Sequence, residues 1–430
     1  MEYLGNKLDL IFKLIGEDVS GSMVELKKVE QLDSKNVEKY KLNKLKNLME
    51  FACDNSVFYG SLFGDELANG VDPQEILSQM KPIDKQVIRE NFEDMICEKA
   101  PGGWRCTSGT SGSPFVFPKD KRALSYMDGM MFSVYQWHGI DPCDRQARLW
   151  GRAVGRVAGF SQKMKDFVLG RKRLSVFAMN DVSCREYFYA LKKIKPRYFY
   201  CYPNAIYQFA LSLERQGLNG RDLGVPIAIC TGEVLFPHCR EKIEESFGCK
   251  VVNEYGSSEN GIIGFECEFG RMHILPTVIV QIINPDAGGF GKIAITELNS
   301  RSLPFINYTN GDVGRLDMGR CCCGKPFDVL EIKDARVDSY IKCQDGTIVY
   351  DAILAYIFSG KVAQFRAIQE RIDLITIKVV PNGAFGVDLQ DSISLKIKSY
   401  LGDNVSIIFD IVDKIPHEKS GKLRYFIPMN

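Results

Sequence analysis

Cys106-Thr107-Ser108-Gly109-Thr110-Ser111-Gly112-Ser113-Pro114 is the most informative stretch of this chain, with five hydroxyl side chains, two glycines and no charged residue. Glycines let the backbone turn tightly and bring its N–H groups close to an anion, and hydroxyls add further donors. The stretch therefore predicts a loop that binds phosphate oxygens. The alternative is an ordinary Ser/Thr/Gly surface turn. It is not a Walker A loop, because no Gly-Lys-Ser/Thr follows.

The bulk composition indicates a large, nearly neutral protein. Its 430 residues are 45% hydrophobic, and 55 Lys+Arg against 54 Asp+Glu leave a net charge of +1, which makes no electrostatic case for nucleic acid. The N-terminus lacks the pattern of a signal peptide, and no stretch approaches ~18 uncharged apolar residues. We therefore expect a cytoplasmic protein without a membrane span, whose 14 cysteines are free thiols or metal ligands rather than disulfides.

Hydrophobic periodicity predicts an α/β fold in two domains. Residues 1–100 have helical patterns, and between about 146 and 300 short apolar runs alternate with polar helical stretches, which is typical of sheets with crossover helices. Expected strands include Val176–Met179, Tyr198–Cys201, Val278–Ile283 and Ile306–Tyr308. Beyond about 337 the order becomes helix-strand-strand-helix-strand. We expect a large N-terminal domain, 1–336, and a small, mobile α+β domain, 337–430.

Asn253-Glu254-Tyr255-Gly256-Ser257-Ser258-Glu259 follows one of these strand-like runs. Gly256 is expected to permit a tight turn, after which Glu259 would face a phosphate-bound Mg²⁺, an ion that prefers oxygen ligands. Tyr255 offers a ring for a base or ribose. The alternative is a strand-exit turn with a solvated glutamate.

Tyr308-Thr309-Asn310-Gly311-Asp312 ends another strand-like run. A carboxylate after a glycine turn can accept two hydrogen bonds from a ribose diol, which makes Asp312 a candidate ribose ligand. The alternative is an Asn-Gly turn that only closes a hairpin.

The segment Pro416-His417-Glu418-Lys419-Ser420-Gly421-Lys422-Leu423-Arg424 lies near the C-terminus. A lysine beside a glycine turn on a mobile tail can reach into a cleft as a point charge. Lys422 would then bridge a carboxylate oxygen and an α-phosphate as negative charge builds up between them. The alternative is a solvated basic tail.

Cys267, His273, Cys321 and Cys323 form a candidate metal set. Thiolate and imidazole ligands in a set of four suit tetrahedral Zn²⁺ in a closed structural site. The spacing is irregular, so free cysteines with an unrelated histidine are the alternative. The other three histidines have no Cys or Ser partner in a recognisable spacing, which gives a Cys/His or Ser/His nucleophile little support.

Together these elements resemble the adenylate-forming superfamily of acyl-CoA synthetases, peptide-synthetase adenylation domains and luciferases, over roughly residues 104–428. Each motif alone is weak, but six stand in the family's order. They are the phosphate loop 106–114, the adenine-side segment Thr231-Gly232-Glu233, the aromatic-Gly-x-x-Glu element 253–259, the ribose turn 308–312, the hinge Arg336-Val337-Asp338 and the lysine element Ser420-Gly421-Lys422. The chain is most similar to phenylacetate–coenzyme A ligase-like proteins of the capsular-polysaccharide-biosynthesis group. That group commonly carries a Cys/His cluster, which favours Zn²⁺.

The resemblance implies an ATP-dependent, AMP-forming ligase. A small carboxylic acid would attack the α-phosphate of ATP–Mg²⁺ to give an acyl-adenylate, and a thiol, expected to be coenzyme A, would then take the acyl group. The implied catalytic residues are Lys422, Glu259 and Arg336, and Asp338 is the implied hinge of the C-terminal lid. The implied nucleotide-binding residues are Thr107, Ser108, Gly109, Thr110, Ser111, Gly112, Thr231, Gly232, Glu233, Asn253, Tyr255, Gly256, Ser257, Ser258 and Asp312.

Two other functions stay open at this point. In the first, the enzyme would transfer the acyl group to an amine, an amino sugar or a carrier protein. Thr347 bears on this acyl transfer, because it stands where the family often has Arg or His. The second is a non-catalytic nucleotide-binding protein, for which Ser113 and Asn310 are further signs because they depart from the family pattern. Retention of Lys422 and Asp312 argues against it.

Overall fold

A computed structural model describes residues 5–97, 102–106, 115–151, 166–176, 179–317, 319, 321–334, 340–346, 348–358, 361–381, 383–415 and 425–429. Several of the predicted functional residues lie outside these ranges. They are the loop residues 107–112, the hinge residues Arg336 and Asp338, and Lys422. The described chain divides into two compact units, which are treated separately below.

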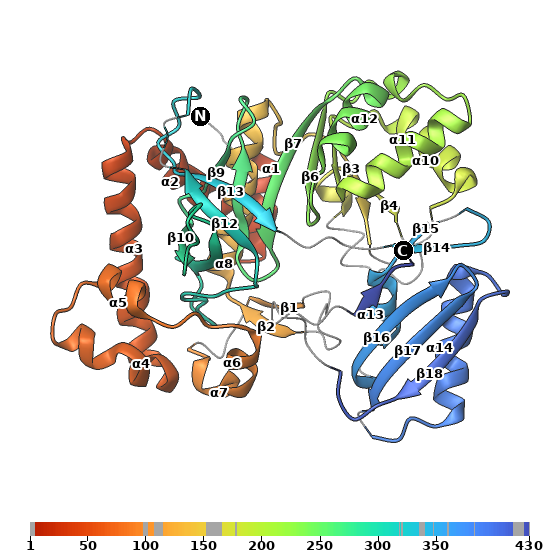
Figure 1. The fold of residues 1–430 in the computed structure, drawn as a ribbon. Helices are drawn as coiled ribbons and strands as arrows, with labels where there is room; N and C mark the ends of the chain where they lie inside the picture. Colours follow the sequence, from red (N-terminus) through yellow and green to blue (C-terminus); the bar gives the residue numbers. More distant parts are fainter. Residues whose placement is uncertain are drawn as a thin grey trace. The chain divides into compact units, whose positions relative to one another are not determined.

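The first unit comprises Met1–Arg105, Val116–Asp144 and Val252–Ala335. Its helices are α1 (Asn6–Leu14), α2 (Val19–Glu30), α3 (Ser34–Asn55), α4 (Val57–Ala68), α5 (Pro73–Gln79), α6 (Lys85–Glu90), α7 (Phe92–Met95), α8 (Lys121–Tyr135) and the 3₁₀ helix η1 (Gln136–His138). The predicted helical lead-in is thus confirmed (Figure 1). Five of its helices begin after an Asp or Ser whose side chain accepts a hydrogen bond from the first turn, at Asp18, Asp33, Ser56, Asp72 and Asp84.

The strands of this unit pair antiparallel in the order β10-β11-β12-β13-β9-β8-β7. Their bounds are β7 Lys250–Ser257, β8 Gly261–Glu266, β9 Met272–Ile274, β10 Val278–Ile283, β11 Gly291–Glu297, β12 Val313–Asp317 and β13 Val329–Asp334, with β1 (Gly103–Cys106) and β2 (Val116–Lys119) as a separate pair. The strand predicted at Ile306–Tyr308 is wrong. Asn307 has φ +51°, which interrupts extended backbone, and Tyr308 makes only isolated bridges to Ile83 and Ile295.

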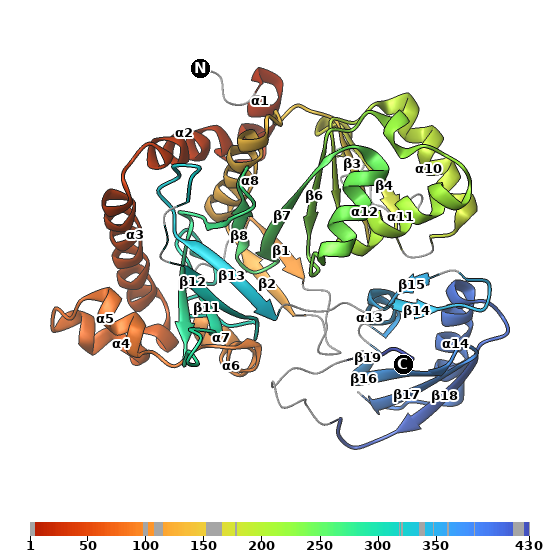
Figure 2. The same ribbon diagram turned by 45° about the horizontal axis from the view of Figure 1, so that its top comes forward.

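The second unit includes Arg145–Val251, which forms a parallel sheet in the order β6-β5-β3-β4. Its elements are β3 (Gln146–Trp150), β4 (Arg171–Ser175), α10 (Asp181–Ile194), β5 (Tyr198–Cys201), α11 (Pro203–Arg215), η2 (Gly220–Leu223), β6 (Ile227–Thr231) and α12 (Pro237–Phe247), and Figure 2 shows the helices beside the strands. The predicted alternation of strands and helices is confirmed. Residues 177 and 178 of the strand expected at Val176–Met179 lie outside the described ranges, and β4 ends just before it, at Ser175, in a polar Arg-Lys-Arg run without an apolar signal.

Residues 340–429 have a hydrophobic core of their own, with Phe358, Phe365 and Ile377 at its centre. The elements are β14 (Tyr340–Lys342), β15 (Ile348–Tyr350), α13 (Ala352–Phe358), β16 (Val362–Arg371), β17 (Leu374–Pro381), α14 (Val387–Leu401), β18 (Ser406–Ile411) and β19 (Phe426–Ile427), with sheet order β18-β17-β16-β19. The predicted helix-strand-strand-helix-strand order is confirmed from α13 to β18. None of the helices in the described part of the chain is long and apolar enough to cross a bilayer.

Candidate functional site

Glu259 is a buried, ionised carboxylate on the turn between β7 and β8. Its Oε1 lies 2.9 Å from Nζ of Lys85 and accepts a 2.8 Å hydrogen bond from the hydroxyl of Tyr308. Burial opposes ionisation, but the Lys85 ammonium and these hydrogen bonds outweigh it, so the pKa of Glu259 lies below its ordinary value. A buried negative charge held in this way is suited to binding a cation or a cationic group.

Two glycines shape the hairpin that carries Glu259. Gly256 lies within β7 rather than in a turn, and a Cβ there would lie 2.6 Å from the carbonyl oxygen of Gly261. The turn itself uses Gly261, whose φ of +71° is unfavourable for residues with a Cβ. The predicted tight turn at Gly256 is therefore corrected. Gly256 permits close approach of two backbones, and Asn260 stabilises the turn by donating its N–H to Oγ of Ser257 over 3.0 Å.

Tyr255 and Asp312 join the two predicted nucleotide motifs. The Tyr255 hydroxyl donates a 2.9 Å hydrogen bond to Oδ2 of Asp312, and the Asn310 side-chain amide donates to the same oxygen over 2.7 Å. The turn has Gly311 at φ +87°, and Asp312 is buried. The Tyr255 ring packs in the hydrophobic core of the unit. Tyr255 therefore orients Asp312 through its hydroxyl.

Asn253 and Ser258 belong to the same 253–259 motif. The backbone N–H of Asn253, in β7, donates a 2.8 Å hydrogen bond to Oε2 of Glu266, in β8. Ser258 is exposed in the turn beside Glu259. A ligand approaching the turn can therefore reach the Ser258 hydroxyl.

Thr231, Gly232 and Glu233 lie in the second unit, at the carboxyl end of β6. Gly232 has φ +83°, and a Cβ there would lie 3.0 Å from the ring of Tyr202. Oε2 of Glu233 accepts the backbone N–H of Asn204 in the first turn of α11 over 3.1 Å, a position where a carboxylate is favourable. The segment thus lies at the edge of a parallel sheet where ligands commonly bind.

Aromatic side chains stack beside this segment. The Trp150 ring lies 4.2 Å from that of Tyr202 and 5.3 Å from that of Tyr200, at interplanar angles of 20° and 28°. The Arg148 guanidinium lies 4.3 Å from the centre of the Tyr200 ring. All four residues are half-buried and come from β3 and from the end of β5. The three rings and the guanidinium thus form one aromatic stack with a positive charge beside it.

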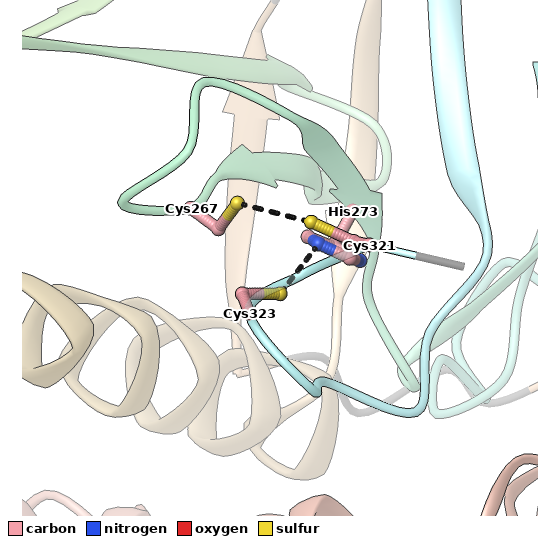
Figure 3. Close-up of side chains that lie close together, drawn as sticks. All are labelled: Cys267, His273, Cys321 and Cys323. Atoms are coloured by element: carbon pink, nitrogen blue, oxygen red, sulfur yellow. Dashed lines mark hydrogen bonds between the residues drawn. The ribbon is translucent and has the colours of Figure 1, made fainter. Parts of the chain in front are cut away.

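The four predicted metal ligands converge in the first unit (Figure 3). Their ligand atoms all lie within 4.8 Å of one another. Sγ of Cys267 lies 3.7 Å from Sγ of Cys321, and Sγ of Cys323 lies 3.2 Å from Nε2 of His273. A turn that closes with Gly324 at φ +73° presents the two later cysteines. A set of three thiols and an imidazole at this separation can hold one tetrahedral ion.

The surroundings of His273 prepare its ring to act as a ligand. Nδ1 lies 3.0 Å from the backbone carbonyl of Phe327, so the tautomer that donates there leaves Nε2 directed at Cys323. Burial lowers the pKa of His273, which keeps the imidazole neutral near pH 7. The ring also packs edge-on against Trp137 at 6.3 Å.

One residue of this site has no signal in the sequence. Lys85 is the first residue of α6, and nothing in the neighbouring sequence distinguishes it from other lysines at the start of a helix. Backbone pairing of Ile83 with Asn307 and Thr309 brings it to Glu259. Helix α6 begins after Asp84, which caps it by accepting the backbone N–H groups of Gln86 and Val87.

Comparison with solved structures identifies the fold. A 2-hydroxyisobutyryl-CoA ligase, solved in complex with 2-HIB-AMP and CoA in its thioesterification state, covers 94% of this chain and 91% of its own length with a TM-score of 0.63 and 20% identity. The chain therefore has the fold of an adenylate-forming ligase, as the order of its motifs predicts.

Sequence comparison is more specific. Residues 341–428 match the family described as the CapK C-terminal domain. Protein CapK of Staphylococcus aureus is 24% identical over 87% of this chain and 85% of its own length. A phenylacetate-coenzyme A ligase of Thermus thermophilus is 22% identical over 69% of each chain. The predicted resemblance to phenylacetate–coenzyme A ligase-like and CapK-like proteins is thus confirmed.

Proposed function

We propose that the protein activates a small carboxylic acid with ATP–Mg²⁺ to an acyl-adenylate and then transfers the acyl group to a thiol, with coenzyme A as the acceptor. The observation that carries the proposal is the hydrogen bond from Tyr255 to Asp312. It joins two motifs distant in sequence, one ending in the buried carboxylate of Glu259, so that a ribose ligand and a metal ligand share one unit.

The nucleotide roles follow from this arrangement. Asp312 would accept hydrogen bonds from the ribose diol, oriented by Tyr255, and Arg336 would lie near it. Asn253, Gly256, Ser257 and Ser258 would shape and line the turn beside the phosphates. Thr107, Ser108, Gly109, Thr110, Ser111 and Gly112 would bind the outer phosphates, and Thr231, Gly232 and Glu233 would bind the adenine side.

The charge that develops at the α-phosphate needs a stabilising cation, and Lys422 would supply it. Residues 337–430 would act as a lid that turns about Asp338, closing for adenylation and rotating for acyl transfer. The separate hydrophobic core of residues 340–429 supports their treatment as an independent domain.

Glu259 fits a Mg²⁺ ligand. Its carboxylate is ionised, so it would supply an oxygen ligand of the kind that Mg²⁺ prefers. When bound, the metal would neutralise charge on the nucleotide phosphates.

The acid would bind against the stacked surface of Trp150, Tyr200 and Tyr202. These aromatic side chains favour an aryl, amino or short acyl acid. The CoA ligases among the similar proteins support a thiol acceptor. The resemblance noted in the sequence also implies a place in surface-polysaccharide biosynthesis, in which an amine or amino sugar acceptor is the alternative.

The test is ATP–pyrophosphate exchange across a panel of aryl, amino and short-chain acids, followed by AMP release with coenzyme A or amines. We expect exchange with at least one acid and AMP release that depends on coenzyme A. Release that depends on an amine instead would assign the alternative acceptor. ATP binding without exchange across the panel would favour a non-catalytic nucleotide-binding protein.

We also propose that Cys267, His273, Cys321 and Cys323 hold one structural Zn²⁺. Elemental analysis of protein purified without added zinc should give about one Zn per chain. Cys323→Ser removes a ligand and should lower this content and the melting temperature, whereas Cys322→Ser, the exposed neighbour outside the cluster, should change neither. Metal-free protein with fully titratable cysteines would rule the site out.

A further inference from the structure

Lys85 brings a positive charge from the N-terminal helices to the Glu259 carboxylate. Its side chain is 20% exposed, whereas that of Glu259 is 4% exposed. The position is well defined, because the N–H of Ile83 donates to the Asn307 carbonyl and the N–H of Thr309 donates to the Ile83 carbonyl, both over 2.9 Å. The ammonium is thus anchored beside the turn proposed to bind the metal and phosphates.

Stability alone is a weak reason for this ion pair, because the cost of removing two charges from water offsets much of their attraction. An ammonium has three N–H donors. One such group can therefore contact a carboxylate and a phosphate oxygen together, and partial exposure allows a ligand to reach it.

A further cation would complement the loop at 106–114, which is proposed to bind the outer phosphates. The loop contains no Lys, Arg or His, so its own donors to a polyphosphate are neutral. The buried negative charge of Glu259 would also repel phosphate oxygens. A cation that touches Glu259 compensates both effects, and Lys85 is in that position.

We propose that Lys85 is a nucleotide-binding residue whose ammonium contacts the pyrophosphate portion of ATP. The inference rests on the proposed function and adds to it a cation supplied by the helical N-terminal segment. The ligand class is a pyrophosphate group, so AMP, which lacks one, does not use this contact.

The test is calorimetric binding of ATP, inorganic pyrophosphate and AMP in buffer without Mg²⁺, which removes any contribution through a metal on Glu259 and leaves the proposed Zn²⁺ in place. Lys85→Met should weaken ATP and pyrophosphate binding about 10- to 100-fold, the range for losing a hydrogen bond to a charged group. AMP binding should stay within about twofold. Lys85→Arg should recover part of the loss. Lys81 is an exposed lysine that precedes α6, and Lys81→Met should have no effect.

A second background separates direct contact from an effect through Glu259. Glu259→Gln removes the buried charge that Lys85→Met would leave unpaired, so the double variant should fold. Lys85→Met should still weaken Mg²⁺-free pyrophosphate binding at least about 10-fold in this background. No further loss there would overturn the inference. If the wild-type protein binds no ATP, the proposed function is wrong as well; if it binds ATP and Lys85→Met binds equally, only the role of Lys85 is wrong.

Discussion

Gly256→Ala should damage the protein at the hairpin that carries Glu259. The added Cβ would lie 2.6 Å from the carbonyl oxygen of Gly261 and 3.3 Å from Cα of Ile262. Both neighbours are backbone atoms, so no side chain can rotate away. Ordinary contacts begin at 3.4 Å, and the strands must therefore separate by roughly 0.8 Å at this point.

This displacement has two measurable consequences. Forced overpacking costs about 1–3 kcal/mol of unfolding free energy, which urea denaturation would detect as a lower midpoint at unchanged slope. A shift approaching 1 Å at a binding carboxylate can reduce the rate by about 10²-fold. Carboxylate-dependent ATP–pyrophosphate exchange should therefore fall by one to two orders of magnitude in folded Gly256→Ala protein.

Gly220→Ala is the matched control. Gly220 and Ser246 both lie in the second unit, and a Cβ at Gly220 would lie 2.6 Å from the carbonyl oxygen of Ser246. It should lower stability by a similar amount without a comparable loss of exchange per folded molecule. Gly256→Ala protein with wild-type stability and exchange would refute the reasoning, because the close approach of β7 and β8 would then have no cost.

Three further predictions concern charged residues. Lys422→Ala should slow adenylation about 10²–10³-fold, whereas Lys419→Ala on the same tail should have little effect; wild-type exchange in the former would exclude Lys422 from the reaction. Asp312→Ala should raise the apparent KM for ATP, and an unchanged KM would remove its ribose role. Because the folded pKa of Glu259 lies below its ordinary value of 4.5, its ionisation stabilises the fold above that pH, and this contribution is lost as the pH falls through the lowered value. Glu259→Gln should therefore flatten the dependence of unfolding free energy on pH below about pH 5, which denaturation at several pH values would check; an unchanged slope would contradict the ion pair.

The secondary structure was predictable where apolar residues follow a regular pattern. Strands β5 and β10 have the bounds that their apolar runs predict, Tyr198–Cys201 and Val278–Ile283. Strand β4 was missed because it is the edge strand of its sheet and begins with an Arg-Lys-Arg run, which gives no apolar signal. At Asn307 the error has a different cause, a left-handed residue inside an apolar run.

The candidate site was predictable only where its residues lie within short motifs. Asp312 stands after a glycine turn that the sequence reveals, and Glu259 was identified from its motif although the turn predicted at Gly256 was wrong. The partners of these residues could not be predicted in this way, since the Lys85 contact depends on backbone pairing between segments far apart in the chain. The role of Gly256 was also misread, because a close approach between strands leaves no mark in the residues that flank the glycine.

By itself, the sequence determined the class of fold, the order of the motifs proposed to bind nucleotide and the four members of the Cys/His cluster. These properties depend on neighbouring residues, whose spacing limits the local conformation. Tertiary structure alone decided that Tyr255 orients Asp312, that Lys85 meets Glu259 and that the Cys267 and Cys323 thiols lie at one imidazole. Each of these contacts arises from strand pairing and burial that join distant segments, and composition and spacing do not record which segments will meet.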